Sequence, residues 1–185
     1  MFTKEYWLSS WKKLKSVKYL AIMGMMIAMK VILNNIRIPV SDNLNIMFSY
    51  IPAAMEGMII GPAAAMVSGL ITDLLGVMTS NYGPFFPGYT ISKVLGGLIY
   101  GLFFYLAKPS LARIAGCKAV INYVVNVGLG SLWSAMMMGK AYMYYFSTSI
   151  VKNTILLPIE IAILFLVFRF LYPILKRNGI ISDSI

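Results

Sequence analysis

Residues 46–78 read IMFSYIPAAMEGMIIGPAAAMVSGLITDLLGVM, an apolar run whose only charged residues are Glu56 and Asp73. The run is longer than the roughly 20 residues that a single membrane-spanning helix needs. Gly61 and Pro62 lie near its middle, and proline is well suited to the first turn of a new helix. We therefore expect two consecutive membrane spans here, at about 46–60 and 63–78.

The rest of the chain has the same apolar character. Of its 185 residues, 59% are hydrophobic and 12% are charged, whereas soluble domains average about 25% charged residues. Four further apolar runs lie at about 17–33, 89–107, 119–138 and 149–175. The sequence thus predicts an all-α integral membrane protein, a single domain over residues 1–185 built as a bundle of six transmembrane helices.

The distribution of basic residues predicts the orientation of this bundle. With six spans, both termini lie on one side of the membrane, together with most of the basic residues: Lys4, Lys12, Lys13, Lys15, Lys18, Lys108, Arg113, Lys118, Lys176 and Arg177. By the positive-inside rule, both termini are expected to be cytoplasmic. This topology accounts for the net charge of +10 without a nucleic-acid partner.

Residues 1–16 precede the first span as a basic cytoplasmic lead-in. Its apolar residues, Phe2, Tyr6, Trp7, Leu8 and Trp11, are expected to lie at the membrane interface. The alternative is a disordered basic tail.

The residue inventory argues against an enzyme. The chain contains no histidine and one cysteine, Cys117, which excludes a Ser-His-Asp triad, a Cys/His zinc site and an internal disulfide. The sequence also lacks the GxxxxGK[ST] phosphate-binding loop of ATPases. We expect no catalytic residues, no metal and no cofactor.

Seven ionisable residues fall inside the predicted spans, where charges are costly and commonly functional. They are Lys30, Glu56, Asp73, Lys93, Lys152, Glu160 and Arg169. The acids either pair with bases between helices or serve a function, and Arg169 is expected to reach the cytoplasmic face.

Lys93 and Lys152 stand at the outer ends of their spans. Together with Arg37 and Lys140 in the adjoining loops, they could form an outward-facing site for an anion. The alternative is that each meets a carboxylate or a lipid headgroup.

Aromatic residues gather at the same end, among them Phe85, Phe86, Tyr89, Trp133 and Tyr142. They suit either a pocket for a flat organic ligand or an ordinary interfacial aromatic belt. In the first span, Ala21, Gly24 and Ala28 form a ridge of small residues that permits close contact with a partner helix or internal packing.

Several short stretches follow one another along the chain in a specific order. The most specific is Gly83-Pro-Phe-Phe-Pro-Gly-Tyr-Thr90, followed by Leu95-Gly-Gly-Leu-Ile-Tyr-Gly101. The others are Gly57-Met-Ile-Ile-Gly-Pro62, Gly128-Leu-Gly-Ser-Leu-Trp133 and Lys152-Asn153. In this order they resemble the substrate-binding S components of energy-coupling factor (ECF) vitamin transporters, and most closely their folate type.

The resemblance implies a bacterial plasma-membrane protein that binds folate near its outer face. It also implies delivery of the vitamin through a transmembrane coupling protein driven by two cytosolic ATPases, which would meet the helix carrying Ala21, Gly24 and Ala28. The implied substrate-binding residues are Arg37, Phe85, Phe86, Pro87, Gly88, Tyr89, Thr90, Lys93, Trp133, Tyr142, Lys152 and Asn153.

The chain departs from the folate type where other members often carry arginine, since Ser149 and Asn45 stand at those positions. Another vitamin or precursor, such as pantothenate, is the alternative within the class. A structural or accessory membrane protein is the alternative from another class, and a membrane enzyme is the least favoured.

Overall fold

The computed structural model describes residues 4–41, 44–79, 85–139 and 141–181, with only the backbone described for residues 37–41 and 44–46. The described segments form a helical bundle with one short hairpin. In chain order the elements are α1 (Lys4–Lys13), α2 (Val17–Asn35), β1 (Arg37–Ser41), β2 (Leu44–Met47), α3 (Tyr50–Ile60), α4 (Pro62–Thr79), α5 (Pro87–Phe104), α6 (Leu111–Val120), η1 (Ile121–Leu129), α7 (Gly130–Met138) and α8 (Tyr142–Arg177).

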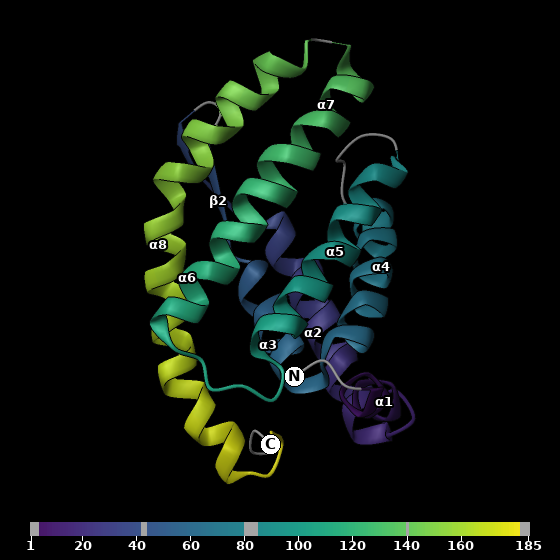
Figure 1. Ribbon diagram of the computed structural model, residues 1–185. Helices are drawn as coiled ribbons and strands as arrows, with labels where there is room; N and C mark the ends of the chain where they lie inside the picture. The colour runs from purple at the N-terminus through teal and green to yellow at the C-terminus, as the bar shows by residue number, and fades with distance from the viewer. Residues whose placement is uncertain (1–3, 42–43, 80–84, 140, 182–185) are drawn as a thin grey trace.

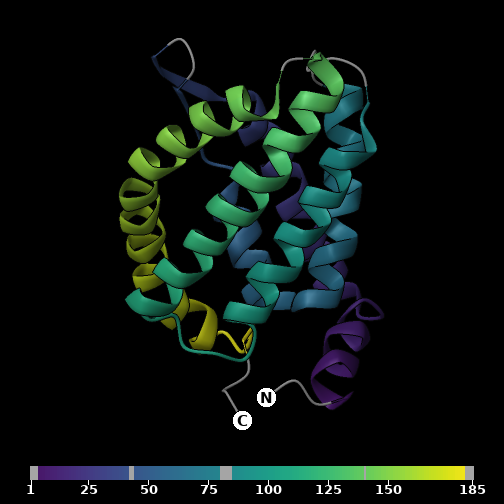
Figure 2. The same cartoon turned by 45° about the horizontal axis from the view of Figure 1, so that its top comes forward.

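The long helices run alongside one another, and both termini lie at the same end of the bundle (Figure 2). In the described part of the chain, four continuous helices are long and apolar enough to cross a membrane: α2, α4, residues 111–138 and α8. The expected helical bundle is confirmed, whereas the count of six spans and the side on which the termini lie stay predictions.

The connection after α2 differs from the sequence-based expectation. Strands β1 and β2 pair antiparallel, with Arg37 opposite Met47, where a loop was expected. Helix α3 consequently begins at Tyr50, and the expectation that this span starts at residue 46 is wrong.

Helices α4 and α5 pack closely because glycines lie along their contact. A Cβ atom added at Gly69, Gly97 or Gly101 would collide with backbone atoms of the facing helix. The small residues therefore let the two backbones approach directly, as small residues do between helices in lipid.

Helix α1 packs on the junction between α3 and α4. Gly61 forms this junction with a φ of +87°, a left-handed conformation that glycine adopts without steric cost. Ser10 Oγ donates to Ile60 O at 2.9 Å and accepts from Ala64 N at 3.3 Å, while Tyr6 Oη donates to Gly101 O at 3.0 Å. Tyr6 is thus buried against the protein, so its side chain does not face the surroundings as an interfacial residue was expected to.

Residues 111–138 form one continuous helix in which η1 is a π-helix. Its start lies several residues before the expected position of 119. Lys118 was expected in a loop between spans, but it is buried within this helix. Helix α8 bows around one side of the bundle (Figure 2); it contains Pro158 and Pro173, and proline is a recognised cause of helix bending.

The α4–α5 contact gives a testable prediction. Gly97→Ala places a Cβ against the backbone oxygen of Ala65, so we expect it to lower the free energy of unfolding by about 1–3 kcal/mol, the usual cost of overpacking. Thermal unfolding in detergent measures the effect. The adjacent Gly96→Ala is the matched control, because nothing lies within 4 Å of its added Cβ. Equal stability of the two variants would contradict the close packing described here.

Candidate ligand-binding site

An aromatic cluster forms at the bundle end opposite the termini, where α5 meets α7. The Phe86 ring lies 6.0 Å from that of Tyr89 and 6.0 Å from that of Trp133, measured between centroids. Gly88 lies beneath the cluster, and a Cβ at this position would collide with the Trp133 ring. Glycine at position 88 therefore allows Trp133 to pack directly on the start of α5.

Two hydrogen bonds hold this cluster in place. Trp133 Nε1 donates to Ser92 Oγ at 3.0 Å, and Tyr89 Oη lies 3.0 Å from Ser134 Oγ. Each bond joins α5 to α7. The rings consequently form a fixed apolar surface whose polar atoms are already satisfied, which suits stacking against a flat ligand.

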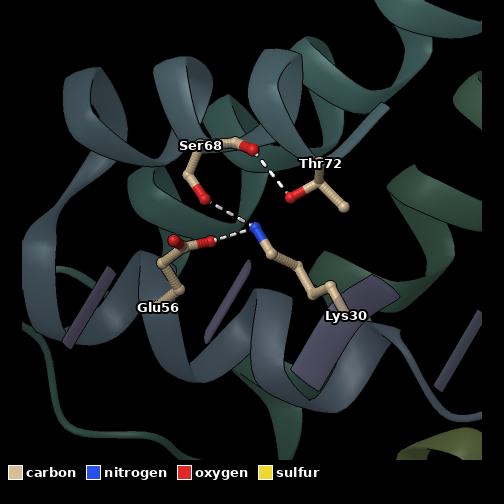
Figure 3. A network of polar contacts seen from close by, with 4 residues as sticks. All are labelled: Lys30, Glu56, Ser68 and Thr72. Atoms are coloured by element: carbon tan, nitrogen blue, oxygen red, sulfur yellow. Dashed lines mark hydrogen bonds and ion pairs between the residues drawn. The ribbon is translucent and has the colours of Figure 1, made fainter. Parts of the chain in front are cut away.

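A buried polar network lies deeper in the bundle, between α2, α3 and α4 (Figure 3). Lys30 Nζ contacts Glu56 Oε2 at 2.5 Å and Ser68 Oγ at 2.7 Å, and Thr72 Oγ1 donates to Ser68 O at 2.7 Å. Both charged side chains are almost fully buried. The pair therefore neutralises two of the embedded charges and ties three helices together.

A second network joins α6 and η1 to α8. Lys118 Nζ lies 2.9 Å from Glu160 Oε2 and 4.3 Å from the centroid of the Tyr50 ring. Asn122 Nδ2 donates to the same carboxylate oxygen at 2.8 Å. From the sequence, Glu160 could have either a structural or a functional role. In the structure it is paired with Lys118 and Asn122.

Lys93 on α5 differs from these two buried lysines. Protein surrounds it closely enough for electrostatic interaction with both Asp73 and Lys30, yet its side chain remains solvent-exposed. Among the described residues, it has no ion-pair partner within 4 Å, and the neighbouring Asp73 accepts a hydrogen bond from Thr90 at 2.6 Å. The charge of Lys93 is therefore available to a ligand that approaches this part of α5.

Asn126 on η1 is a candidate that the sequence analysis missed. Its Nδ2 lies 3.3 Å from Asn122 Oδ1 and 3.4 Å from Asn153 Oδ1, and its side chain is exposed although both partners are buried. The recurrence of polar residues at 118, 122 and 126 is a signal in the sequence. The π-helix, a feature frequent at functional sites, has no such signature.

The remaining predicted residues lie apart from this arrangement. Phe85, Pro87 and Thr90 line an apolar groove against α4 on the bundle's flank. Tyr142 packs on Phe146 within α8. Lys152 is half-buried beside Asn153. Arg37 belongs to β1, of which only the backbone is described, and Lys140 lies outside the described residues.

The predicted docking ridge lies on a free face of α2. Ala21, Gly24 and Ala28 are all exposed, and nothing lies within 4 Å of a Cβ added at Gly24. Within the described chain, this ridge is therefore not used for internal packing.

Comparisons with known proteins agree on one family. Residues 18–168 match the family described as "ECF transporter, substrate-specific component". The folate transporter FolT of Clostridium novyi is 34% identical over 152 residues, covering 82% of this chain and 88% of that protein. FolT of Leuconostoc mesenteroides is 28% identical over 149 residues, covering 77% and 80% respectively. A crystal structure of FolT bound with folic acid superposes with a TM-score of 0.76 at 27% identity, covering 83% of this chain and 94% of that one.

The Lys30–Glu56 pair provides a stability test. Lys30→Met leaves the buried Glu56 carboxylate without its cation, so we expect a loss of about 3–5 kcal/mol in the free energy of unfolding. The double variant Lys30→Met/Glu56→Leu removes both charges and should recover most of that loss. Denaturant unfolding of the two variants and the parent measures the difference. A double variant no more stable than Lys30→Met would show that the charges do not act as a pair.

Proposed function

Because the chain belongs to the family of substrate-specific components of ECF transporters, we propose that it captures folate and hands it to an ATP-driven transport module. Members of this family bind the transported substrate and are not enzymes. The family match over residues 18–168 confirms the resemblance seen in the sequence. The relatives named as folate transporters, and the structural neighbour bound with folic acid, support folate as the ligand.

The chemistry of folate matches the aromatic and the polar residues of the site. Folate carries a flat heteroaromatic ring at one end and two carboxylates at the other. The cluster of Phe86, Tyr89 and Trp133 offers an apolar surface for stacking, and Asn126 with Asn153 offers amide groups for hydrogen bonding. Lys93 supplies a positive charge for a carboxylate.

The exposed, unpaired state of Lys93 is the single observation that carries this assignment. Lys30 and Lys118 each meet a glutamate inside the bundle, whereas Lys93 has no such partner among the described residues. An exposed lysine without a direct partner keeps its charge available for the carboxylate of a ligand. Lys30 and Lys118, which are already paired inside the protein, do not offer their charges in this way.

Serine at 149 and asparagine at 45 leave fewer cations for the ligand than other folate-type members offer. We propose that Lys93 takes the main electrostatic role, supported by Lys152, by Arg37 of β1 and by Lys140, which lies outside the described residues. The affinity should therefore depend strongly on this one lysine.

Delivery of the vitamin requires the partners that the family implies. We propose that the α2 ridge of Ala21, Gly24 and Ala28 docks on a transmembrane coupling protein, which two cytosolic ATPases drive. In this arrangement the protein lies in a bacterial plasma membrane with both termini in the cytoplasm.

The ligand assignment can be tested with purified protein in detergent. We expect folate, and not pantothenate, riboflavin, thiamine or biotin, to raise the melting temperature and to bind with sub-micromolar affinity by calorimetry. Tighter binding of pantothenate than of folate would identify pantothenate, the alternative ligand, as the substrate. Absence of binding to every vitamin tested would overturn the transport proposal.

Lys93→Ala tests the assigned cation. Loss of one charge-assisted hydrogen bond, worth about 1.5–3 kcal/mol, should weaken folate binding roughly 10- to 150-fold. Lys108→Ala is the control, because Lys108 is exposed and follows the C-terminal end of α5, whereas Lys93 lies in the first half of that helix. Unchanged affinity in a folded Lys93→Ala protein would remove Lys93 from the site.

Gly24→Leu/Ala28→Leu tests the docking ridge. Bulky side chains on an exposed ridge should prevent close helix contact, so the variant should bind folate normally but fail to copurify with the coupling protein and ATPases. Gly96→Leu/Ala162→Leu makes the same change at an open glycine of α5 and an exposed alanine of α8. Loss of copurification in both variants would mean that the ridge is not specific.

A further inference from the structure

Helix α1 has two faces with different chemistry. One face carries Tyr6, Ser10 and Lys13, and each side chain hydrogen-bonds a backbone carbonyl elsewhere in the bundle: Gly101, Ile60 and Ile59, respectively. Lys13 Nζ also lies over the rings of Tyr19 and Tyr105, within 4.8 Å and 4.6 Å of their centroids. These contacts fix the orientation of the helix on the protein.

The opposite face consists of Lys4, Leu8, Trp11, Lys12 and, just past the helix end, Lys15. The spacing of three and four residues between Lys4, Leu8, Trp11 and Lys15 places them on one side. Leu8 is 49% exposed and Trp11 is 52% exposed, and the three lysines are exposed as well. Two large apolar side chains are therefore presented to the surroundings between positive charges.

The position of α1 suits contact with a membrane surface. It lies at the end of the bundle where the chain begins, and Figure 1 looks almost along its axis while α4, α5 and α8 run up the picture. The helix thus lies across the direction of the spans. An amphipathic helix in this orientation can lie in the plane of the headgroups.

We propose that this face of α1, formed by Lys4, Leu8, Trp11, Lys12 and Lys15, is a docking surface for anionic phospholipid at the membrane interface. Leu8 and Trp11 enter the boundary between headgroups and acyl chains, while the lysines bind the phosphates. This contact with lipid is separate from capture of the vitamin and does not depend on which ligand the site binds.

Charge favours lipid over a protein partner as the occupant. Glu5 is the only acidic residue before Asp42, whereas Lys4, Lys12, Lys15 and Lys18 are all exposed. An anionic leaflet attracts each lysine near its surface. A Trp and a Leu between lysines are also the residue types that interfacial helices use.

Trp11 provides the probe for this proposal in the full-length protein. Trp7→Phe/Trp133→Phe leaves Trp11 as the only tryptophan. The protein is placed in nanodiscs of phosphatidylcholine alone or mixed with phosphatidylglycerol, with and without brominated acyl chains. Bromine quenching reports insertion of Trp11, and quenching by acrylamide reports its exposure to water.

We expect Trp11 to be quenched by bromine and protected from acrylamide, with both effects stronger in discs that contain phosphatidylglycerol and weakened by high salt. Lys4→Gln/Lys12→Gln/Lys15→Gln should abolish the dependence on phosphatidylglycerol. Lys108→Gln/Lys176→Gln/Arg177→Gln, which removes three exposed charges elsewhere, should preserve it. Matching melting temperatures establish that each variant is folded.

Three outcomes would overturn the proposal. Trp11 could remain accessible to acrylamide in every disc, which would leave α1 in water. It could be quenched equally with and without phosphatidylglycerol, which would remove the anionic preference. It could become protected only when the coupling protein is added, which would make the face a protein interface. None of these outcomes bears on folate binding, which is measured separately on the chain with all three tryptophans.

Discussion

A charge inside a lipid bilayer must be neutralised within the protein, and this requirement organises the whole bundle. Lys30 meets Glu56 between α2 and α3, and Lys118 meets Glu160 between α6 and α8. Each pair is costly to break once it is buried, so each ties together the helices that carry it. Lys93 differs from these two lysines, because it is exposed and its charge is available for another molecule.

The sequence predicted those features that depend on composition and short patterns. Apolar runs located the helices, and the Gly61-Pro62 step located the break between α3 and α4. The Gly83–Thr90 motif with Lys93 indicated the family. The embedded charges were also identified, but Glu56 and Glu160 could pair with several lysines, and only the three-dimensional arrangement selects Lys30 and Lys118.

Features that depend on contacts between distant segments could not be predicted. Lys118 resembles a loop residue in the sequence, and its burial follows from Glu160 more than 40 residues later. The π-helix that carries Asn122 and Asn126 has no compositional signature. Tyr6 appeared to be an interfacial aromatic residue, yet its hydroxyl bonds Gly101 across the bundle. In each case a tertiary partner outweighed the local pattern.

The glycine contact between α4 and α5 has a consequence for how this scaffold can diversify. The backbones of α4 and α5 touch at Gly69, Gly97 and Gly101. No side chain lies between them whose size could change to shift α5, the helix that carries Lys93. A change of ligand preference would therefore have to come from side chains that face away from this contact, such as Tyr89 on α5 and Trp133 on α7, while the spacing between α4 and α5 stays the same.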